Sequence, residues 1–332
     1  MMNRRYFLRC STGGLVTTVV GSSALLHASS RLFAQGTATP APSPSPTPPP
    51  TPVFKPLRRG VGYFTARGGT IGWLVSKSAL AAVDAQFPDT AKLFLDGLPE
   101  RGGRPFDLLF NTHHHADHTS GNLTFKQTGA VPAETSIAAH RNVPELQRAA
   151  ATVDNSLDKQ VFAATLFDKD WQRELGDETV RAYHFGPAHT GGDAVLHFEK
   201  ANVVHVGDLV FNKLYPFIDR RGGASITGWM NVLEKLHKQF AGGSSADTIF
   251  IFGHGKPAAG VTGSGKELLE MRDYLGGLLE FVRKEIAAGK SKDDIVKNET
   301  LPGFEAYHDP RPNRLGQNLT TAFEELTGAP KS

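Results

Sequence analysis

The sequence predicts an α/β protein in which two β-sheets pack against each other and helices cover their outer faces. Strand-like segments, many of them mostly apolar, occur in two sets along the chain, and helical patterns accompany each set. This order, strands that pair locally and then helices, twice over, is typical of two packed sheets. Hydrophobic residues make up 39% and charged residues 21% of the 332 residues, which suits a folded soluble chain and argues against wholesale disorder.

The predicted elements follow from local patterns. Strands of the first set are expected at 60–66, 70–76, 80–84 and 106–110, with a helix over 89–98. Strands of the second set are expected at 180–185, 194–199, 202–206 and 248–252, with helices over 228–240 and 265–288. The charged segment 145–178 has a helix-like pattern, and we expect it to form a lid or an insertion over the site.

Residues 1–34 have the features of an export signal. A cationic start that contains Arg4 and Arg5 precedes a short apolar stretch and small residues. The arginine pair, followed by an aromatic residue and a leucine, resembles a twin-arginine signal, whose export machinery carries folded proteins. We expect cleavage after Ala28 or Ala34, a periplasmic or secreted product, and no stable membrane insertion afterwards. An uncleaved anchor is the alternative, but the apolar stretch is short for a span of roughly 20 residues.

Residues 35–55 separate this leader from the folded part of the chain. Proline, serine, threonine and alanine dominate the segment, and it has almost no apolar bulk to bury. Such a composition predicts an extended, polyproline-like tether. Residues 56–332 have a globular composition and are predicted to form one domain.

Charge and cysteine content exclude several functions. The formal charge of +3 includes four arginines among residues 1–34, which hold no acid, so the remaining residues carry −1. A nearly neutral domain has no basic surface for nucleic acid, and we expect none as a partner. The single cysteine, Cys10, lies in the leader. The predicted domain therefore has no disulfide, thiolate ligand or cysteine nucleophile.

A histidine cluster follows the strand predicted at 106–110. Residues 113–118 read His-His-His-Ala-Asp-His, so four histidines and one aspartate occupy six positions. Alternating histidines at the end of a strand can direct two imidazoles at one ion, and the residues past the turn can face a neighbouring ion. Imidazole and carboxylate are ligands that suit zinc and similar divalent metals. A fortuitous or tag-like histidine tract is the alternative, and it predicts no companion ligands elsewhere.

Companion ligands do occur, each at the end of a predicted strand. His189 lies in a glycine-rich turn, Asp208 follows Gly207, and His254 is flanked by two glycines. Glycines beside such residues permit the backbone angles that a crowded turn needs. One isolated histidine after a strand is usually structural, but several such features in series favour a common site.

The order His-x-His-x-Asp-His, then His, Asp and His, resembles the metallo-β-lactamase superfamily of metallohydrolases across essentially the whole predicted domain. The resemblance implies a four-layer αββα sandwich with two divalent metal ions, most often Zn²⁺ with Fe or Mn possible. The implied ligands are His113, His115 and His189 for the first ion, Asp117, His118 and His254 for the second, and Asp208 bridging both. It also implies that Asp84 supports the metal-binding loops and that Asp117 steers the proton of a hydroxide nucleophile in catalysis.

The resemblance implies a small-molecule substrate without identifying it. An aspartate at the bridging position is similar to the glyoxalase II, lactonase and phosphodiesterase branch, which favours an ester, thioester, lactone or related carbonyl bond. Many true β-lactamases have cysteine or serine there, yet an exported β-lactamase remains an alternative. An iron-dependent, dioxygenase-like redox enzyme and a metal-binding protein without catalysis are two others. The sequence does not indicate an oligomeric state.

Other residues near these motifs carry weaker expectations. His114 is expected to point away from the ligands, and Asp193 could orient one of them. Lys213, Tyr215 and Trp229 could line a pocket, although packing and surface roles are the simpler interpretation. Residues 260–266 nearly match a phosphate-binding loop, but Glu267 replaces the Ser/Thr that binds magnesium, so we expect a helix cap. The apolar stripe of the helix at 265–288 is expected to pack on the core, with a dimer face as the alternative.

Overall fold

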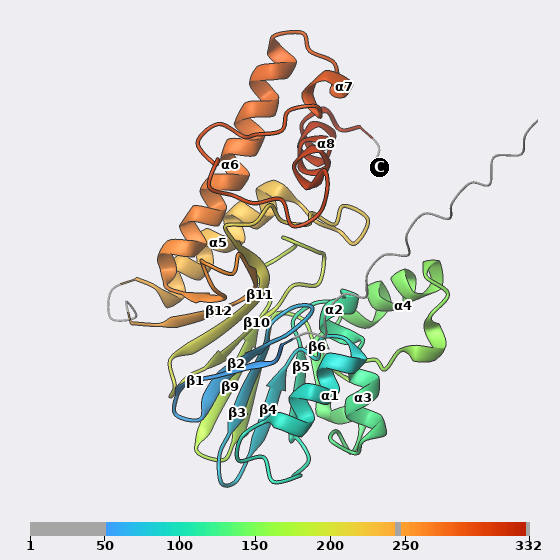
Figure 1. Cartoon of the computed structure of the whole chain (residues 1–332), viewed down its shortest axis with the longest axis vertical. Coiled ribbons are helices and arrows are strands. Elements are labelled where there is room, and N and C mark those ends of the chain that lie inside the picture. The colour runs from blue at the N-terminus through green and yellow to red at the C-terminus, as the bar shows by residue number, and fades with distance from the viewer. Residues whose placement is uncertain (1–50, 243–246, 330–332) are drawn as a thin grey trace, which may run out of the picture. The chain divides into compact units, whose positions relative to one another are not determined.

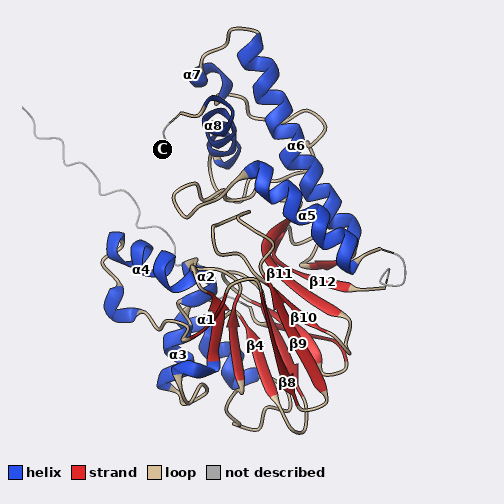
Figure 2. Ribbon diagram, turned by 180° about the vertical axis from the view of Figure 1, so that it is seen from behind, coloured by secondary structure: helices blue, strands red, loops and turns tan. Residues whose placement is uncertain are grey.

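The computed structural model describes residues 51–242 and 247–329 and contains two β-sheets between helical layers (Figures 1 and 2). The predicted leader and most of the predicted tether at 35–55 lie outside the described residues. No helix in these two stretches is long and apolar enough to cross a membrane.

The first sheet has seven strands in the order of the chain. The strands are β1 (Val53–Arg58), β2 (Val61–Thr65), β3 (Ile71–Val75), β4 (Leu80–Val83), β5 (Leu108–Asn111), β6 (Ile137–His140) and β7 (Thr165–Phe167). The pairs from β1 to β4 are antiparallel, and those from β4 to β7 are parallel.

The first strand begins inside the predicted tether, so the tether boundary at residue 55 is wrong by three residues. Val53 pairs with Thr65, and the Phe54 ring lies 4.8 Å from that of Phe64. Pro56 is tolerated because β1 is an edge strand, where one missing backbone donor costs little.

The second sheet has six strands in the order β13-β12-β11-β10-β9-β8. These are β8 (Asp170–Leu175), β9 (Glu178–Tyr183), β10 (Val195–Phe198), β11 (Val203–Asn212), β12 (Ile249–Gly255) and β13 (Thr262–Gly263). Strands β11 and β12 are parallel, and the other neighbours are antiparallel.

Helices cover the outer face of each sheet. The helices are α1 (Pro88–Gly97), α2 (Ala116–Thr119), α3 (Asn122–Gln127), α4 (Val143–Val153), α5 (Ile226–Phe240), α6 (Gly265–Ala287), α7 (Lys292–Ile295) and α8 (Arg314–Thr327). One apolar core joins the first sheet to α1 and α3, and another joins the second sheet to α5, α6 and α8. A third core lies between the sheets, where Phe110 of β5 and Phe198 of β10 are fully buried. The predicted αββα sandwich is therefore confirmed.

The prediction of a helix over residues 145–178 is wrong for the second half of the segment. Helix α4 accounts for its beginning, but β7 and β8 form its second half. Exposure along β8 alternates residue by residue until the buried Leu175, which is the period of a strand. Charged residues on the exposed positions of β8 made the segment resemble a helix.

The phosphate-loop-like segment is a helix cap, as predicted. The Ser264 hydroxyl accepts from Lys266 N, and the Glu267 carboxylate accepts from Ser264 N, which is a capping box at the start of α6. The apolar stripe of α6, including Leu268 and Leu275, packs into the core formed with α5 and α8.

Candidate metal centre

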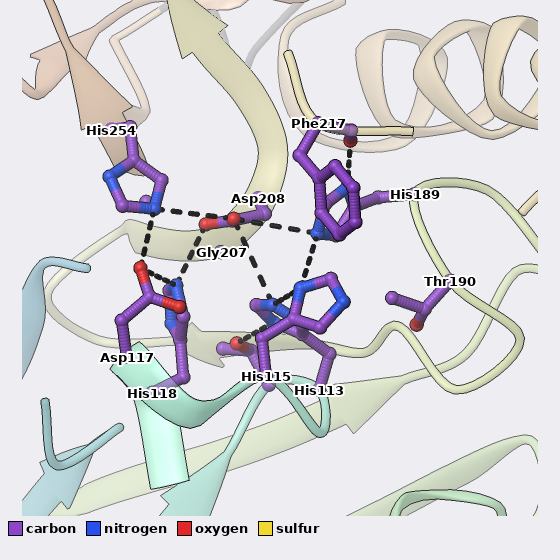
Figure 3. Close-up of polar contacts among 12 residues, drawn as sticks. His113, His115, Asp117, His118, His189, Thr190, Gly207, Asp208, Phe217 and His254 are labelled. Carbon is purple, nitrogen blue, oxygen red and sulfur yellow. Dashed lines mark hydrogen bonds and ion pairs between the residues drawn. The ribbon is translucent and has the colours of Figure 1, made fainter. Parts of the chain in front are cut away.

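The seven predicted ligands converge between the two sheets from distant parts of the chain (Figure 3). The loop after β5 and the start of α2 carry the first four, and three later segments supply the others. One group, with donor atoms all within 4.8 Å of one another, consists of His113, His115, His189 and Asp208. Asp117, His118 and His254 form a second group by the same measure. The alternative of a fortuitous histidine tract is therefore wrong.

Two imidazoles of the first group have their outer nitrogens fixed. His115 Nε2 lies 3.0 Å from Asp219 Oδ2, and His189 Nδ1 lies 2.8 Å from the carbonyl oxygen of Phe217. Carboxylate and carbonyl oxygens accept hydrogen bonds, so each of these nitrogens donates a proton. When the ring is neutral, its other nitrogen, Nδ1 of His115 or Nε2 of His189, has a lone pair that is directed inward.

The inward nitrogens face one another at short range. His115 Nδ1 lies 3.0 Å from both His113 Nε2 and His189 Nε2. Burial lowers the pKa of His113 well below its usual value and that of His189 to about 3, so both rings are neutral at pH 7. The lone pairs of neutral imidazoles that face one another repel unless a proton or a metal ion lies between them. This arrangement fits a divalent metal ion.

The second group surrounds the other side of Asp208. His118 Nε2 lies 3.0 Å from Asp208 Oδ1, and His254 Nε2 lies 3.3 Å from Asp208 Oδ2 and 3.2 Å from Asp117 Oδ2. His118 Nε2 and Asp208 Oδ1 are buried, and neither has a hydrogen bond of acceptable geometry. A cation between these atoms would satisfy both, so this group also fits a metal ion.

Glycines allow this crowding around Asp208. A Cβ atom at Gly253 would lie 1.9 Å from Asp208 Oδ1, and one at Gly69 would lie 2.2 Å from the His118 ring. Gly207 has a φ of +54° where the pairing of β11 with β12 shifts register. The glycines beside the predicted ligands therefore permit close approach as well as unusual backbone angles.

Asp84 supports the loop that carries the histidine cluster, as the resemblance implies. Its carboxylate accepts hydrogen bonds from Thr112 N and Thr112 Oγ1, both at 2.8 Å, and from His118 Nδ1 at 2.7 Å. Since the Thr112 hydroxyl donates to Asp84, it is an acceptor for His113 Nδ1, which lies 3.0 Å away. One buried carboxylate thereby orients an imidazole in each group.

Asp208 and the residues of the second group stabilise each other's charged forms. Although burial raises the pKa of Asp117 and Asp208, the nearby histidines hold both pKa values well below the usual value. Burial lowers the pKa of His254, but the Asp208 and Asp117 carboxylates raise it to about 9. The pKa of His118 is raised well above its usual value by Asp208, Asp84 and Asp117, despite burial. The site thus attracts a positive charge, which a metal ion could supply in place of protons.

Asp219 belongs to the site but carries no sequence motif. Its Oδ2 atom lies 3.0 Å from His115 Nε2 and 3.4 Å from His114 Nε2, and Oδ1 accepts from Gly222 N at 2.8 Å. His114, with its ring 4.5 Å from that of His115, contacts this carboxylate and is only 5% exposed. Asp219 follows no predicted strand, so only the run of three histidines hinted at a further carboxylate.

The remaining expectations are met in part. Asp193 contacts no metal-facing atom; its carboxylate accepts from Thr190 N and Oγ1, both at 2.7 Å, and so stabilises the turn after His189. Burial raises the pKa of Asp193 to about 7. The Trp229 ring is buried 5.3 Å from that of His189 and packs there without lining the pocket.

A cavity of about 940 Å³ opens onto the cluster. Asp117, Asp208 and His254 lie in its wall, together with residues of α4 and the segment before α8. Tyr215 also lines this cavity, whereas Lys213 pairs with Glu270 at 2.7 Å. A small molecule could therefore reach the converging imidazoles and carboxylates.

Comparisons with known proteins agree with this geometry. A family model described as the metallo-beta-lactamase superfamily matches residues 83–254, more than half of the chain. Hydroxyacylglutathione hydrolases of Rhizobium johnstonii and Brucella anthropi are 30% and 29% identical over 47% and 45% of this chain. The chain spans about half the length of these curated relatives, 53% and 50% respectively.

Solved structures show the same fold at low sequence identity. The sec-alkylsulfatase Pisa1 from Pseudomonas sp. has a TM-score of 0.62 at 15% identity, covering 83% of this chain and 50% of the other. A metallo-beta-lactamase from Pontibacter korlensis has a TM-score of 0.53 at 15% identity, covering 68% and 99%.

Proposed function

This chain belongs to the metallo-beta-lactamase superfamily, and we propose that it is an exported hydrolase that uses two divalent metal ions to cleave an ester, thioester or lactone. A metal-dependent hydrolase fits the curated relatives, which are hydroxyacylglutathione hydrolases. The observation that carries the proposal is the convergence of seven side chains, in which two buried inward atoms, His118 Nε2 and Asp208 Oδ1, have no hydrogen-bond partner.

The donor set favours two ions. His113, His115 and His189 would hold the first ion, and Asp208 would contribute to both. The ligands of the second ion would be Asp117, His118 and His254. Four-coordinate sites of imidazole and carboxylate favour zinc, with iron or manganese as alternatives. When bound, such ions make hydroxide available near neutral pH and polarise the substrate oxygen.

The chain's own residues position the substrate and handle the proton. Asp117 is 28% exposed at the cavity wall, and its low pKa keeps the carboxylate ionised at neutral pH. An ionised carboxylate at this position accepts a proton from the attacking water and directs it toward the leaving group. Asp84 and Asp219 hold the imidazoles in the tautomers that direct lone pairs inward.

Asp208 favours the carbonyl-ester branch over the β-lactamases. Asp208 contacts the two groups with different oxygens, Oδ2 at 3.4 Å from His189 Nε2 and Oδ1 at 3.0 Å from His118 Nε2, whereas the cysteine or serine of many β-lactamases would offer one donor atom. The hydroxyacylglutathione hydrolase relatives point to a thioester. The solved structures support the fold alone.

A substrate panel on metal-analysed protein tests the proposal. The panel comprises S-lactoylglutathione, a butyrolactone, an aryl ester, nitrocefin, bis(p-nitrophenyl) phosphate and a secondary alkyl sulfate. We expect the highest kcat/KM with an ester, thioester or lactone and loss of turnover after metal removal. Preference for nitrocefin would favour the β-lactamase alternative, and one iron per chain with oxygen consumption would favour the redox alternative. Bound metal without turnover of any compound would favour a non-catalytic protein.

Export rests on the leader. Residues 1–34, with Arg4 and Arg5, would direct the chain through the twin-arginine machinery to the periplasm or beyond. That route would deliver the domain already folded, with its metal ions in place.

A further inference from the structure

The cavity over the metal centre is positively charged apart from the proposed ligands. Four basic side chains line it, and Asp154 is the one acid besides Asp117 and Asp208. One of the four, Arg67, already pairs with Asp89 at 2.6 Å. The other basic residues are Lys159, Arg311 and Arg314.

Arg314 differs from the other cations because it is buried. It is 9% exposed, and its guanidinium carbon lies 4.8 Å from the centre of the Phe217 ring. Nη1 donates to Gln317 Oε1 at 2.7 Å, but the buried Nε has no hydrogen-bond partner. Across residues 51–242 and 247–329, no carboxylate lies within ion-pair distance of this guanidinium. Burial and the neighbouring Arg311 lower the pKa of Arg314, while Asp309 raises it.

Holding an arginine in this way is costly unless an anion arrives. A buried cation without a counter-ion loses hydration and gains no compensating pair. Stacking on Phe217 fixes the plane of the guanidinium, so its fork of donors is ordered before a ligand binds. An oxyanion would supply the missing acceptor and the missing charge.

Phe217 also places Arg314 close to the reacting end of the cavity. The Phe217 ring lies 5.3 Å from the His115 ring, and the backbone carbonyl oxygen of Phe217 accepts a hydrogen bond from His189 Nδ1. A single aromatic ring therefore separates the guanidinium from imidazoles of the proposed first metal site. Phe87, Phe211 and Leu214 give the cavity an apolar surface between its charged positions.

We propose that Arg314 binds an oxyanion, most simply a carboxylate, on the substrate, and that the substrate is an organic anion with an apolar part. The proposal rests on the hydrolase function above and narrows its substrate class. Arg314 is a specificity residue: it recognises a group a few bonds from the scissile carbonyl and takes no part in bond cleavage. Lys159 and Arg311, both exposed, would add attraction at the rim.

Binding of a matched pair of uncleavable ligands tests the proposal without requiring turnover. 3-(Benzylthio)propanoate and 3-(benzylthio)propanamide differ only in carboxylate against amide, and calorimetry gives their affinities for the metal-loaded and the metal-free protein. We expect wild type to prefer the carboxylate in both forms. Arg314→Gln should weaken carboxylate binding by roughly 10- to 100-fold and amide binding by less than about threefold. Arg314→Lys keeps the positive charge but not the forked arrangement of donors, so its affinity for the carboxylate should lie between those of wild type and Arg314→Gln.

Matched thioesters connect binding to catalysis. S-acetyl-3-mercaptopropanoate and its amide carry the test group on the thiol side; S-glutaryl- and S-glutaramoyl-N-acetylcysteamine carry it on the acyl side. Released thiol can be read with a disulfide reagent, because Cys10 is the chain's single cysteine. Arg314→Gln should reduce kcat/KM for the carboxylate member of one pair and leave its amide partner nearly unchanged. Arg283→Gln, on the exposed face of α6, should change neither.

The outcomes separate the two proposals. The role of Arg314 would be overturned if wild type bound the carboxylate and the amide equally. It would also be overturned if Arg314→Gln and Arg314→Lys lowered the affinity for both ligands to the same extent. No binding of either ligand to wild type would overturn it as well. Carboxylate preference that depends on Arg314 without turnover of any thioester would uphold the binding site and reject the hydrolase.

Discussion

Asp219 offers a test of how the first proposed metal site is built. Its carboxylate holds the outer nitrogen of His115 at 3.0 Å and lies 3.4 Å from that of His114. Removing the carboxylate frees His115 to adopt the other tautomer, which puts a hydrogen on the nitrogen that faces His113 and His189. Metal affinity should fall although no proposed ligand has changed.

The size of the effect follows from the contacts of Asp219. Loss of such an outer partner typically costs ~10- to 100-fold in metal affinity, about 1.4 to 2.7 kcal/mol. The Asp219 side chain is 13% exposed, so solvent screens it weakly. Asp219→Asn keeps one oxygen acceptor and should lower the metal affinity roughly tenfold. Asp219→Ala keeps none and should cost roughly 100-fold.

Competition with a chromogenic zinc chelator measures these affinities, and the absorption spectrum of cobalt-substituted protein reports the ligand geometry. Thermal unfolding checks that the turn at Gly222, whose amide donates to Asp219, remains folded. Asp154→Asn, an acid of the same cavity, is the matched control and should leave affinity unchanged. Wild-type metal affinity in a folded Asp219→Ala variant would show that Asp219 does not fix the tautomer of His115.

Four other results are expected. His118→Ala should bind one metal ion per chain and lose roughly 100-fold or more in hydrolysis; two ions by elemental analysis would contradict this. Asp208→Asn should weaken both sites, so an unchanged stoichiometry at limiting metal would count against the bridging position. The pKa of His254, raised to about 9, means that its protonated form stabilises the metal-free fold. This contribution to the free energy of unfolding is complete below pH 6.5 and is lost as pH rises through 9. Urea titrations should show stability falling over this range with EDTA, while zinc affinity rises; a flat zinc affinity would contradict the proton release. Arg4→Lys with Arg5→Lys should stop export, and undiminished periplasmic protein would reject the twin-arginine leader.

The convergence of these seven side chains could be predicted because each is a histidine or an aspartate near the end of a strand. A glycine next to a histidine or an aspartate indicates a turn in which that side chain packs closely against others. Gly207 before Asp208 and Gly255 after His254 are examples. The prediction of packed sheets succeeded for a related reason, since a strand buried on both faces, such as β4, is continuously apolar.

Two residues outside the metal-binding motifs were harder to predict: Asp219, which contacts His115, and Arg314, which we propose binds the substrate. Asp219 and Arg314 lie far from the motifs in sequence, and neither has a local pattern that distinguishes it from a surface charge. Their roles depend on burial, which tertiary packing of the 217–219 segment and α8 creates. Strand β8 was missed because charged residues at its exposed positions satisfy a helical pattern over a few residues, and β7 has only three residues.

Metal content of the purified domain, read together with anomalous diffraction at the zinc edge, determines how many ions bind and where. We expect two ions per chain on opposite sides of the Asp208 carboxylate, one among His113, His115 and His189. The other ion should lie among Asp117, His118 and His254. A single ion, or ions bound away from these side chains, would rule out a two-metal site at Asp208.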